Sequence, residues 1–105
     1  MKILTKEILK KLPKLYANEE KEAKDIKVPL KLFNPCGSQS WFITEYDPDT
    51  GEAFGYVTGM GCDELGYISI PELLEVKLPF GLRIERDMHW NSNNTLQQVM
   101  NGEKS

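Results

Sequence analysis

The chain has 105 residues, of which 40% are hydrophobic and 28% are charged, and its formal net charge at pH 7 is −3. This length is typical of one domain, so we expect residues 1–105 to form a single domain with one modest core. The net acidity excludes a general electrostatic attraction to nucleic acid or to anionic membranes.

The first element that the sequence predicts is a short basic helix. Thr5 is a suitable N-cap for a helix that begins at Lys6, and apolar residues then recur at helical spacing. Pro13 lacks an amide hydrogen, so we expect the helix to end or kink there. Residues 1–27 carry eight lysines against five acidic residues, a charge of +3, whereas the remainder carries −6. This contrast indicates either an ordinary solvated helix face or a surface that attracts an acidic partner.

A series of strands is predicted after a polar segment, residues 16–27, which we expect to be a surface loop. Alternating apolar residues predict strands over residues 28–33, 40–47, 52–58 and 67–70. The turn sequence DPDTG joins the second and third strands, so residues 40–58 are predicted to form a β-hairpin. The glycine-rich segment 59–66 is predicted to be a connection, and it lacks a phosphate-binding glycine motif.

Two capping motifs and one further strand complete the pattern. Ser69 and Glu72 match a capping box for a short helix over residues 71–77, and Thr95 and Gln98 match another for a helix over residues 96–101. Between these helices, residues 82–90 (LRIERDMHW) alternate like a strand. The order α-β-β-β-β-α-β-α favours an α+β domain with a mainly antiparallel sheet of about five strands.

Four acidic residues raise the one catalytic hypothesis that the sequence offers. Glu45 and Asp47 lie two positions apart on one predicted strand, and Glu85 and Asp87 do so on another. On adjacent strands these carboxylates would gather around Mg²⁺ or Mn²⁺, as in phosphodiester chemistry. Acidic pairs on strands are more often ordinary surface residues, so we assign no catalytic residue, metal site or cofactor.

Arg86 is the one charge in the apolar row of the last predicted strand, between Ile84 and Met88. Strand alternation places Glu45 in the same row as Trp41, on the side that we expect to face the core. Buried charges need partners, and a guanidinium group can bind a carboxylate through two hydrogen bonds. We therefore expect Arg86 to be largely buried and paired with Glu45, so that Arg86→Ala costs about 3–5 kcal/mol.

The cysteine spacing and the N-terminal sequence indicate the cellular compartment of the protein. Cys36 and Cys62 are far apart in the sequence, and His89 is the only histidine, so we expect incidental free thiols rather than a zinc site or a nucleophile. The N-terminal sequence is charged throughout and lacks the apolar core of a signal peptide. No run approaches the roughly 18 apolar residues of a membrane span. The sequence therefore predicts a cytoplasmic protein.

Ordered motifs along nearly the whole chain resemble one family. The motifs are LTKEILKKLPKLYANEE, SWFITEYDPDTGEAFGYV, DELGYISIPELLEV and IERDMHW. Together they resemble the family known as domain of unknown function 2958, small proteins of bacterial plasmids, phages and integrated mobile elements. That family has no established activity or catalytic residues. The resemblance therefore implies only a mobile-element setting, with an accessory role in transfer, evasion of host defence or nucleic-acid metabolism.

The function that the sequence favours is that of a non-enzymatic accessory protein that binds another macromolecule, in the first place a protein. One alternative is a metal-dependent enzyme that acts on nucleic acid through the four carboxylates. Another is binding of nucleic acid by the lysines of the first helix. We expect no membrane partner, and the oligomeric state stays open. The candidate binding residues are Glu45, Asp47, Glu85, Arg86, Asp87, His89 and Trp90.

Overall fold

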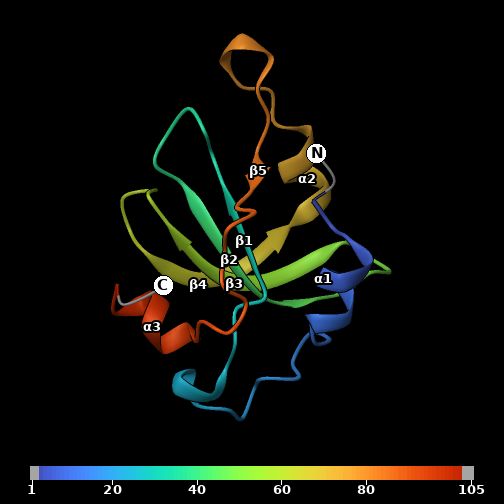
Figure 1. Ribbon diagram of the computed structural model, residues 1–105, viewed down its shortest axis with the longest axis vertical. Coiled ribbons are helices and arrows are strands. Elements are labelled where there is room, and N and C mark those ends of the chain that lie inside the picture. Colours follow the sequence, from blue (N-terminus) through green and yellow to red (C-terminus); the bar gives the residue numbers. More distant parts are fainter. Residues whose placement is uncertain (1–2, 103–105) are drawn as a thin grey trace.

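A five-stranded antiparallel sheet, in the order β4-β3-β2-β1-β5, forms the centre of the computed structural model, which describes residues 3–102 (Figure 1). This architecture confirms the predicted α+β fold. Two single-turn 3₁₀ helices, η1 (Ala23–Asp25) and η2 (Pro79–Gly81), interrupt the loops. The main elements are α1 (Lys6–Lys11), β1 (Leu30–Phe33), β2 (Ser40–Tyr46), β3 (Glu52–Thr58), β4 (Glu64–Ser69), α2 (Ile70–Glu75), β5 (Glu85–Arg86) and α3 (Leu96–Met100).

The helices begin where the capping motifs predict. The side chain of Thr5 accepts the amide of Ile8 at the start of α1, and Ser69 caps α2 by accepting the amide of Glu72. At α3 both halves of the capping box form between Thr95 and Gln98. These side chains satisfy amides that have no partner within the helix, which stabilises helices too short to form alone. α1 ends at Lys11, before the predicted break at Pro13.

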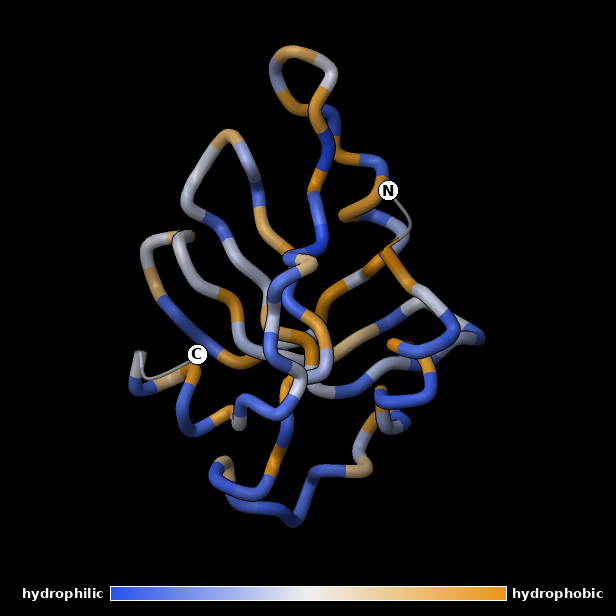
Figure 2. The backbone as a smooth tube through the Cα atoms, in the orientation of Figure 1, coloured by the Kyte–Doolittle hydropathy of each residue, from blue (hydrophilic) through white to orange (hydrophobic). Residues whose placement is uncertain are grey.

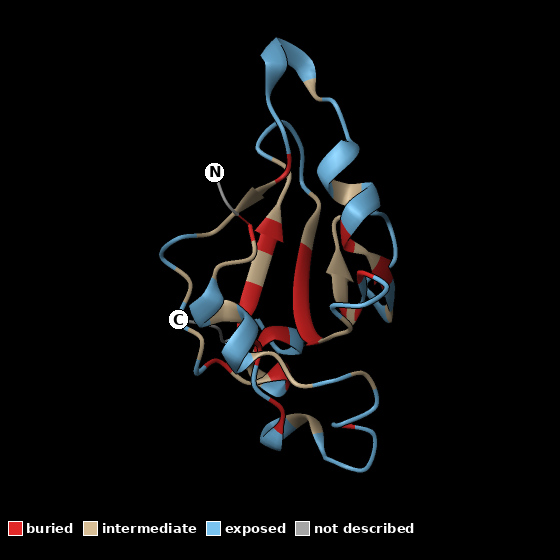
Figure 3. Cartoon of the chain, turned by 90° about the vertical axis from the view of Figure 1, so that its right-hand side faces the viewer, coloured by how far each residue is buried: buried red, intermediate tan, exposed pale blue. Residues whose placement is uncertain are grey.

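The two faces of the sheet carry separate cores, because successive side chains of β2 point to opposite faces. Trp41 and Ile43 belong to the core on the first face, against which residues of α1 and α2 also pack. Phe42 belongs to the core on the second face, with Leu96 and Val99 of α3. The buried residues lie mainly along the central strands (Figure 3). The sheet is thus covered in part on both faces, by α1 and α2 on the first and by α3 with η1 on the second.

The last strand is much shorter than the sequence predicts. β5 pairs with β1 only through Glu85 opposite Phe33 and Arg86 opposite Leu32. The side chain of Asp87 then accepts the amide of His89, and this Asx turn ends the strand. Met88 is 66% exposed, so its predicted place on a core-facing row is wrong. β4, in contrast, begins earlier than predicted, because residues 64–66 continue its pairing with β3.

The loop between α2 and β5 projects from the rest of the molecule (Figure 1). Much of its chain is hydrophobic (Figure 2), yet the loop is largely exposed (Figure 3). Phe80 at its turn is 97% exposed and has a left-handed backbone conformation, with φ of 62°. This conformation is uncommon for a residue other than glycine. The loop therefore presents a large apolar side chain to its surroundings.

Two glycines that lie opposite each other on β3 and β4 test the strand pairing. A Cβ atom on Gly55 would lie 2.1 Å from the Phe42 carbonyl oxygen, whereas one on Gly66 would meet no atom within 4 Å. We expect Gly55→Ala to lower the free energy of unfolding by about 1–3 kcal/mol or more, because the backbone must shift. Gly66→Ala should leave it unchanged or raise it, since glycine weakens a strand interior. Urea melts measure both, and equal destabilisation would contradict this register.

Candidate functional site

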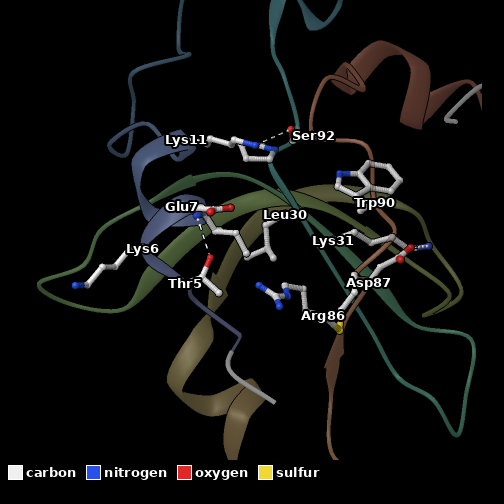
Figure 4. Close-up of a pocket in the computed structure, with 13 residues that line it drawn as sticks. Thr5, Lys6, Glu7, Lys11, Leu30, Lys31, Arg86, Asp87, Trp90 and Ser92 are labelled. Carbon is white, nitrogen blue, oxygen red and sulfur yellow. Dashed lines mark hydrogen bonds and ion pairs between the residues drawn. The ribbon is translucent and has the colours of Figure 1, made fainter.

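Three of the candidate binding residues, Arg86, Asp87 and Trp90, line one cleft of about 590 Å³ (Figure 4). The opposite wall is formed by α1, the basic helix, whose lysines the sequence does not connect with the other candidate residues. The start of β1 forms the floor. We call this site the basic cleft. Its charged residues are Lys6, Lys11, Lys31 and Arg86, against Glu7 and Asp87.

The charge of the basic cleft is opposite in sign to that of the whole chain. The lining has four cationic and two acidic side chains, whereas the net charge of the protein is −3. The ammonium group of Lys31 lies 3.5 Å from the Asp87 carboxylate, so these two charges largely compensate each other. Outside that pair, the lining carries Lys6 and Lys11 of α1 against Glu7, and it carries Arg86, which has an interaction of its own. The cleft is therefore suited to an anionic group.

One wall of the cleft is held in place by a set of contacts around Trp90. The indole Nε1 donates to the Val28 carbonyl oxygen at 2.7 Å, and the ring packs against Phe42 with centroids 5.5 Å apart. The Lys31 ammonium lies over both rings, at 5.6 and 5.7 Å from their centroids. Such cation–π contacts stabilise a charge beside an aromatic wall. The segment that follows β5 is thus fixed to β1 although it forms no strand.

The other wall is α1, whose lysines reach the cleft unequally. The Lys11 ammonium donates to the Ser92 hydroxyl at 3.2 Å and so links the two walls across the top of the cleft. Lys10, its neighbour in the chain, does not line the cleft, which makes the two lysines a matched pair. Arg86 extends from β5 towards α1 (Figure 4). Arg86 is half-buried rather than largely buried, and the residue has an interaction of its own.

The predicted pair between Arg86 and Glu45 is wrong, because a β-bulge separates the two residues. Arg86 lies opposite Leu32 and so belongs to the first face. In β2 the pairing with β3 shifts between Ile43 and Glu45, and Glu45 lies opposite Phe54 on the second face. A bulge adds one residue to a strand and reverses the alternation beyond it. Simple alternation therefore assigned Glu45 to the wrong face.

The Glu45 carboxylate instead holds the loop after α1. It accepts the backbone amide of Tyr16 at 2.7 Å through Oε1 and that of Asn18 at 3.2 Å through Oε2. The Asn18 side chain donates in addition to the Thr44 carbonyl oxygen at 3.4 Å. Hydrogen bonds to an ionised acceptor are stronger than neutral ones. Glu45 is therefore a structural residue that attaches residues 16–18 to the second face.

The other acidic candidates do not converge with Glu45. The side chain of Asp47 accepts the amide of Asp49 in the hairpin turn, and Asp87 pairs with Lys31. Glu85 is on β5, on the opposite side of that strand from Arg86. Over residues 3–102 the structure has no group of three histidine, cysteine, aspartate or glutamate side chains placed to hold a metal ion. The acidic hypothesis thus lacks the geometry that it requires.

The remaining candidates and the thiols are at the surface. His89 is exposed in the Asx turn and does not line the basic cleft. Cys36 and Cys62 are both free and exposed. Within the described part of the chain, no helix is long and apolar enough to span a membrane.

Sequence reasoning missed a second pocket, of about 400 Å³, on the second face. Tyr16, Phe54 and Tyr67 surround it, and Glu45 lies in its lining. The aromatic residues of β3 and β4 were recognised as strand residues, but Tyr16 comes from a loop without periodicity. In the sequence, Tyr16 is only a tyrosine at the start of a polar segment, and this pattern is too common to indicate a site. We call this second site the aromatic pocket.

A double-mutant cycle tests the separation of Glu45 from Arg86. Glu45→Ala removes a carboxylate that accepts two amides, so we expect a loss of at least about 2 kcal/mol of unfolding free energy. Arg86→Ala does not leave Glu45 without its partners, so the two losses should add within about 0.5 kcal/mol. Urea denaturation of the wild type, both single variants and the double variant gives the coupling energy. A coupling well above 1 kcal/mol would show that the residues interact directly.

Comparison with known proteins supports the family resemblance. A model of the family described as protein of unknown function (DUF2958) matches residues 3–103. No curated protein and no solved structure matches the chain. Because the family match covers nearly the whole chain, including all the elements of the sheet, the protein belongs to the DUF2958 family of proteins of unknown function.

Proposed function

We propose that this protein is a non-enzymatic protein-binding module whose basic cleft holds an acidic segment of its partner. The observation that carries the proposal is the excess of positive charge in the cleft of a net-acidic chain. Local charge of one sign in a concave site raises the local concentration of the opposite charge. The contacts of Trp90 and Lys31 keep one wall preorganised, which lowers the entropy lost on binding.

Carboxylates of a peptide suit this cleft better than the phosphates of nucleic acid. A nucleic-acid strand brings a charge with every nucleotide, and its affinity depends on neutralising several of them. Here Glu7 opposes the lysines of α1 and Lys31 is already paired with Asp87, so few positive charges are available to a continuous phosphate backbone. Of the lysines of α1, Lys6 and Lys11 line the cleft but Lys10 does not. The helix therefore offers only part of its charge to one ligand.

The projecting loop supports a protein partner. Phe80 is 97% exposed, and Leu82 and Val76 in the same loop are also exposed. Large exposed apolar side chains are typical of surfaces that bind other proteins, and aromatic residues are frequent among the side chains that dominate such contacts. The loop leads directly into β5, so an apolar contact and the Arg86 side of the cleft belong to one continuous chain segment.

The proposed setting is the cytoplasm of a bacterium that carries a plasmid, phage or integrated element. This part of the proposal rests on the family resemblance alone. In that setting an accessory protein would act by occupying a partner surface rather than by transforming a substrate.

The proposal predicts that a short oligoglutamate peptide binds in the basic cleft. We expect it to shift the amide NMR resonances of Arg86 and Asp87 and the indole resonance of Trp90, and to bind more weakly at high salt. Lys11→Glu should reduce the affinity about tenfold, the effect of about 1.4 kcal/mol, whereas Lys10→Glu should change it much less. The two variants alter the net charge equally, so the comparison separates the cleft from a general charge effect.

The same titration with single-stranded DNA is the contrasting measurement. Tighter binding of DNA than of the peptide, with a steep salt dependence, would replace the proposal by nucleic-acid binding. Equal losses in Lys10→Glu and Lys11→Glu would show that the peptide is not held in the cleft. Absence of any shift at millimolar peptide would remove the cleft as an anion site.

A further inference from the structure

The aromatic pocket has the features of a site for an organic cation. Residues 16–26 form one side of it, β2, β3 and β4 form the floor, and α3 closes the other side. Leu65, Leu96 and Met100 give this lining an apolar part, and Glu45 provides a negative charge. The pocket lies on the second face of the sheet, whereas Arg86 of the basic cleft belongs to the first.

Glu45 brings a nearly buried negative charge to this pocket. It is 5% exposed, and each carboxylate oxygen accepts one backbone amide, from Tyr16 or from Asn18. Among residues 3–102, no lysine, arginine or histidine forms an ion pair with it. An ionised carboxylate has about four lone-pair positions, so each oxygen retains capacity to accept another donor. A buried charge without a counter-charge is costly, and a cation in the pocket would offset that cost.

Three aromatic rings surround the space beside this carboxylate. The Tyr67 ring lies edge to face with Phe54, with centroids 5.2 Å apart, and with Tyr16, with centroids 6.5 Å apart. Tyr16 and Tyr67 are 60% and 57% exposed and so stand at the mouth of the pocket. Aromatic faces carry partial negative charge and attract cations, as in the cages that recognise alkylated ammonium groups. The aromatic rings and the Glu45 carboxylate therefore both favour a cationic ligand.

The electrostatic environment of Tyr67 agrees with this reading. Hydrogen bonding to the Tyr16 side chain raises the pKa of Tyr67, burial adds to the rise, and the negative charges of Glu52 and Glu45 raise it further. Negative charge that disfavours a phenolate also attracts a cation to the same place.

The backbone of Tyr16 is held in an uncommon conformation. Its φ of 70° lies in the left-handed region, where a residue other than glycine has a conformational cost. The hydrogen bond from its amide to Glu45 Oε1, at 2.7 Å, stabilises this conformation. One contact thus fixes the Tyr16 ring at the pocket mouth and the carboxylate beneath it. Strain of this kind is concentrated at functional sites.

We propose that the aromatic pocket binds an alkylammonium group, either of a lysine side chain in a partner or of a free amine. The apolar lining takes the methylene chain, the tyrosine rings contact the charged head, and a free lone pair of Glu45 accepts one of its hydrogens. An ammonium group carries its charge on one compact head, so a single free lone pair of Glu45 is sufficient to accept a hydrogen bond from it. Lys21 stands at the rim, exposed, without an ion pair to Glu45.

The test is an NMR titration of the full chain with n-butylammonium, with n-pentanol as the neutral analogue of similar size. We expect the ammonium ion, but not the alcohol, to shift the amide resonances of Tyr16 and Asn18, which both bind Glu45. Tyr67→Leu should weaken this binding about fivefold or more, the loss of one cation–π contact. Tyr46→Leu, which removes a tyrosine ring on the first face, away from the aromatic pocket, should leave it unchanged. Urea melts of both variants confirm that each is folded.

A second titration with N-acetyl-lysine-N-methylamide identifies the source of the cation. Tighter binding of this compound than of butylammonium supports a lysine side chain, and the reverse order supports a free amine. Equal shifts from pentanol and butylammonium would overturn the proposal, because the pocket would then be only apolar. Absence of shifts at tens of millimolar butylammonium would also overturn it. Tyr67→Leu should leave oligoglutamate binding in the basic cleft unchanged. The experiments can therefore contradict the proposal for either site without contradicting the other.

Discussion

The β-bulge in β2 between Ile43 and Glu45 is the constraint on which the aromatic pocket depends. It turns Glu45 onto the second face, where the carboxylate holds the amides of Tyr16 and Asn18 and fixes the loop that forms one side of the aromatic pocket. Arg86 lies on the first face, opposite Leu32, where it lines the basic cleft. One extra residue in β2 thus places Glu45 on the opposite face of the sheet from Arg86.

Taken together, the two proposals describe a small domain with two recognition sites of opposite charge preference. The basic cleft between α1 and the segment after β5 suits a carboxylate, and the aromatic pocket on the second face suits an ammonium group. Neither site needs a catalytic group to be useful, because each can contribute binding energy through charge and shape alone. A protein surface that carries acidic and basic side chains at the right separation would engage both sites, and the exposed Phe80 adds an apolar contact.

Local patterns predicted the elements of the fold, and tertiary context decided the site. The caps at Thr5, Ser69 and Thr95 are short-range hydrogen bonds, so their sequence spacing was sufficient to place the helices. The bulge has no comparable signature, which is why the Arg86–Glu45 prediction was wrong. Asp87 ends β5 through an Asx turn, whose side-chain hydrogen bond competes with strand formation. The alternation of apolar and polar residues does not predict this turn. Tyr16 reaches its pocket through a contact with a residue 29 positions away.

Amide hydrogen exchange of Tyr16 and Asn18 tests this central role of Glu45 most directly. Both amides lie in a loop, and without their bonds to Glu45 they would exchange like other exposed loop amides. We predict marked protection of both in the wild type, and loss of that protection in Glu45→Ala while the amides of β3 stay protected. Unprotected Tyr16 and Asn18 amides in the wild type, or protection that survives Glu45→Ala, would contradict the placement of Glu45 on the second face.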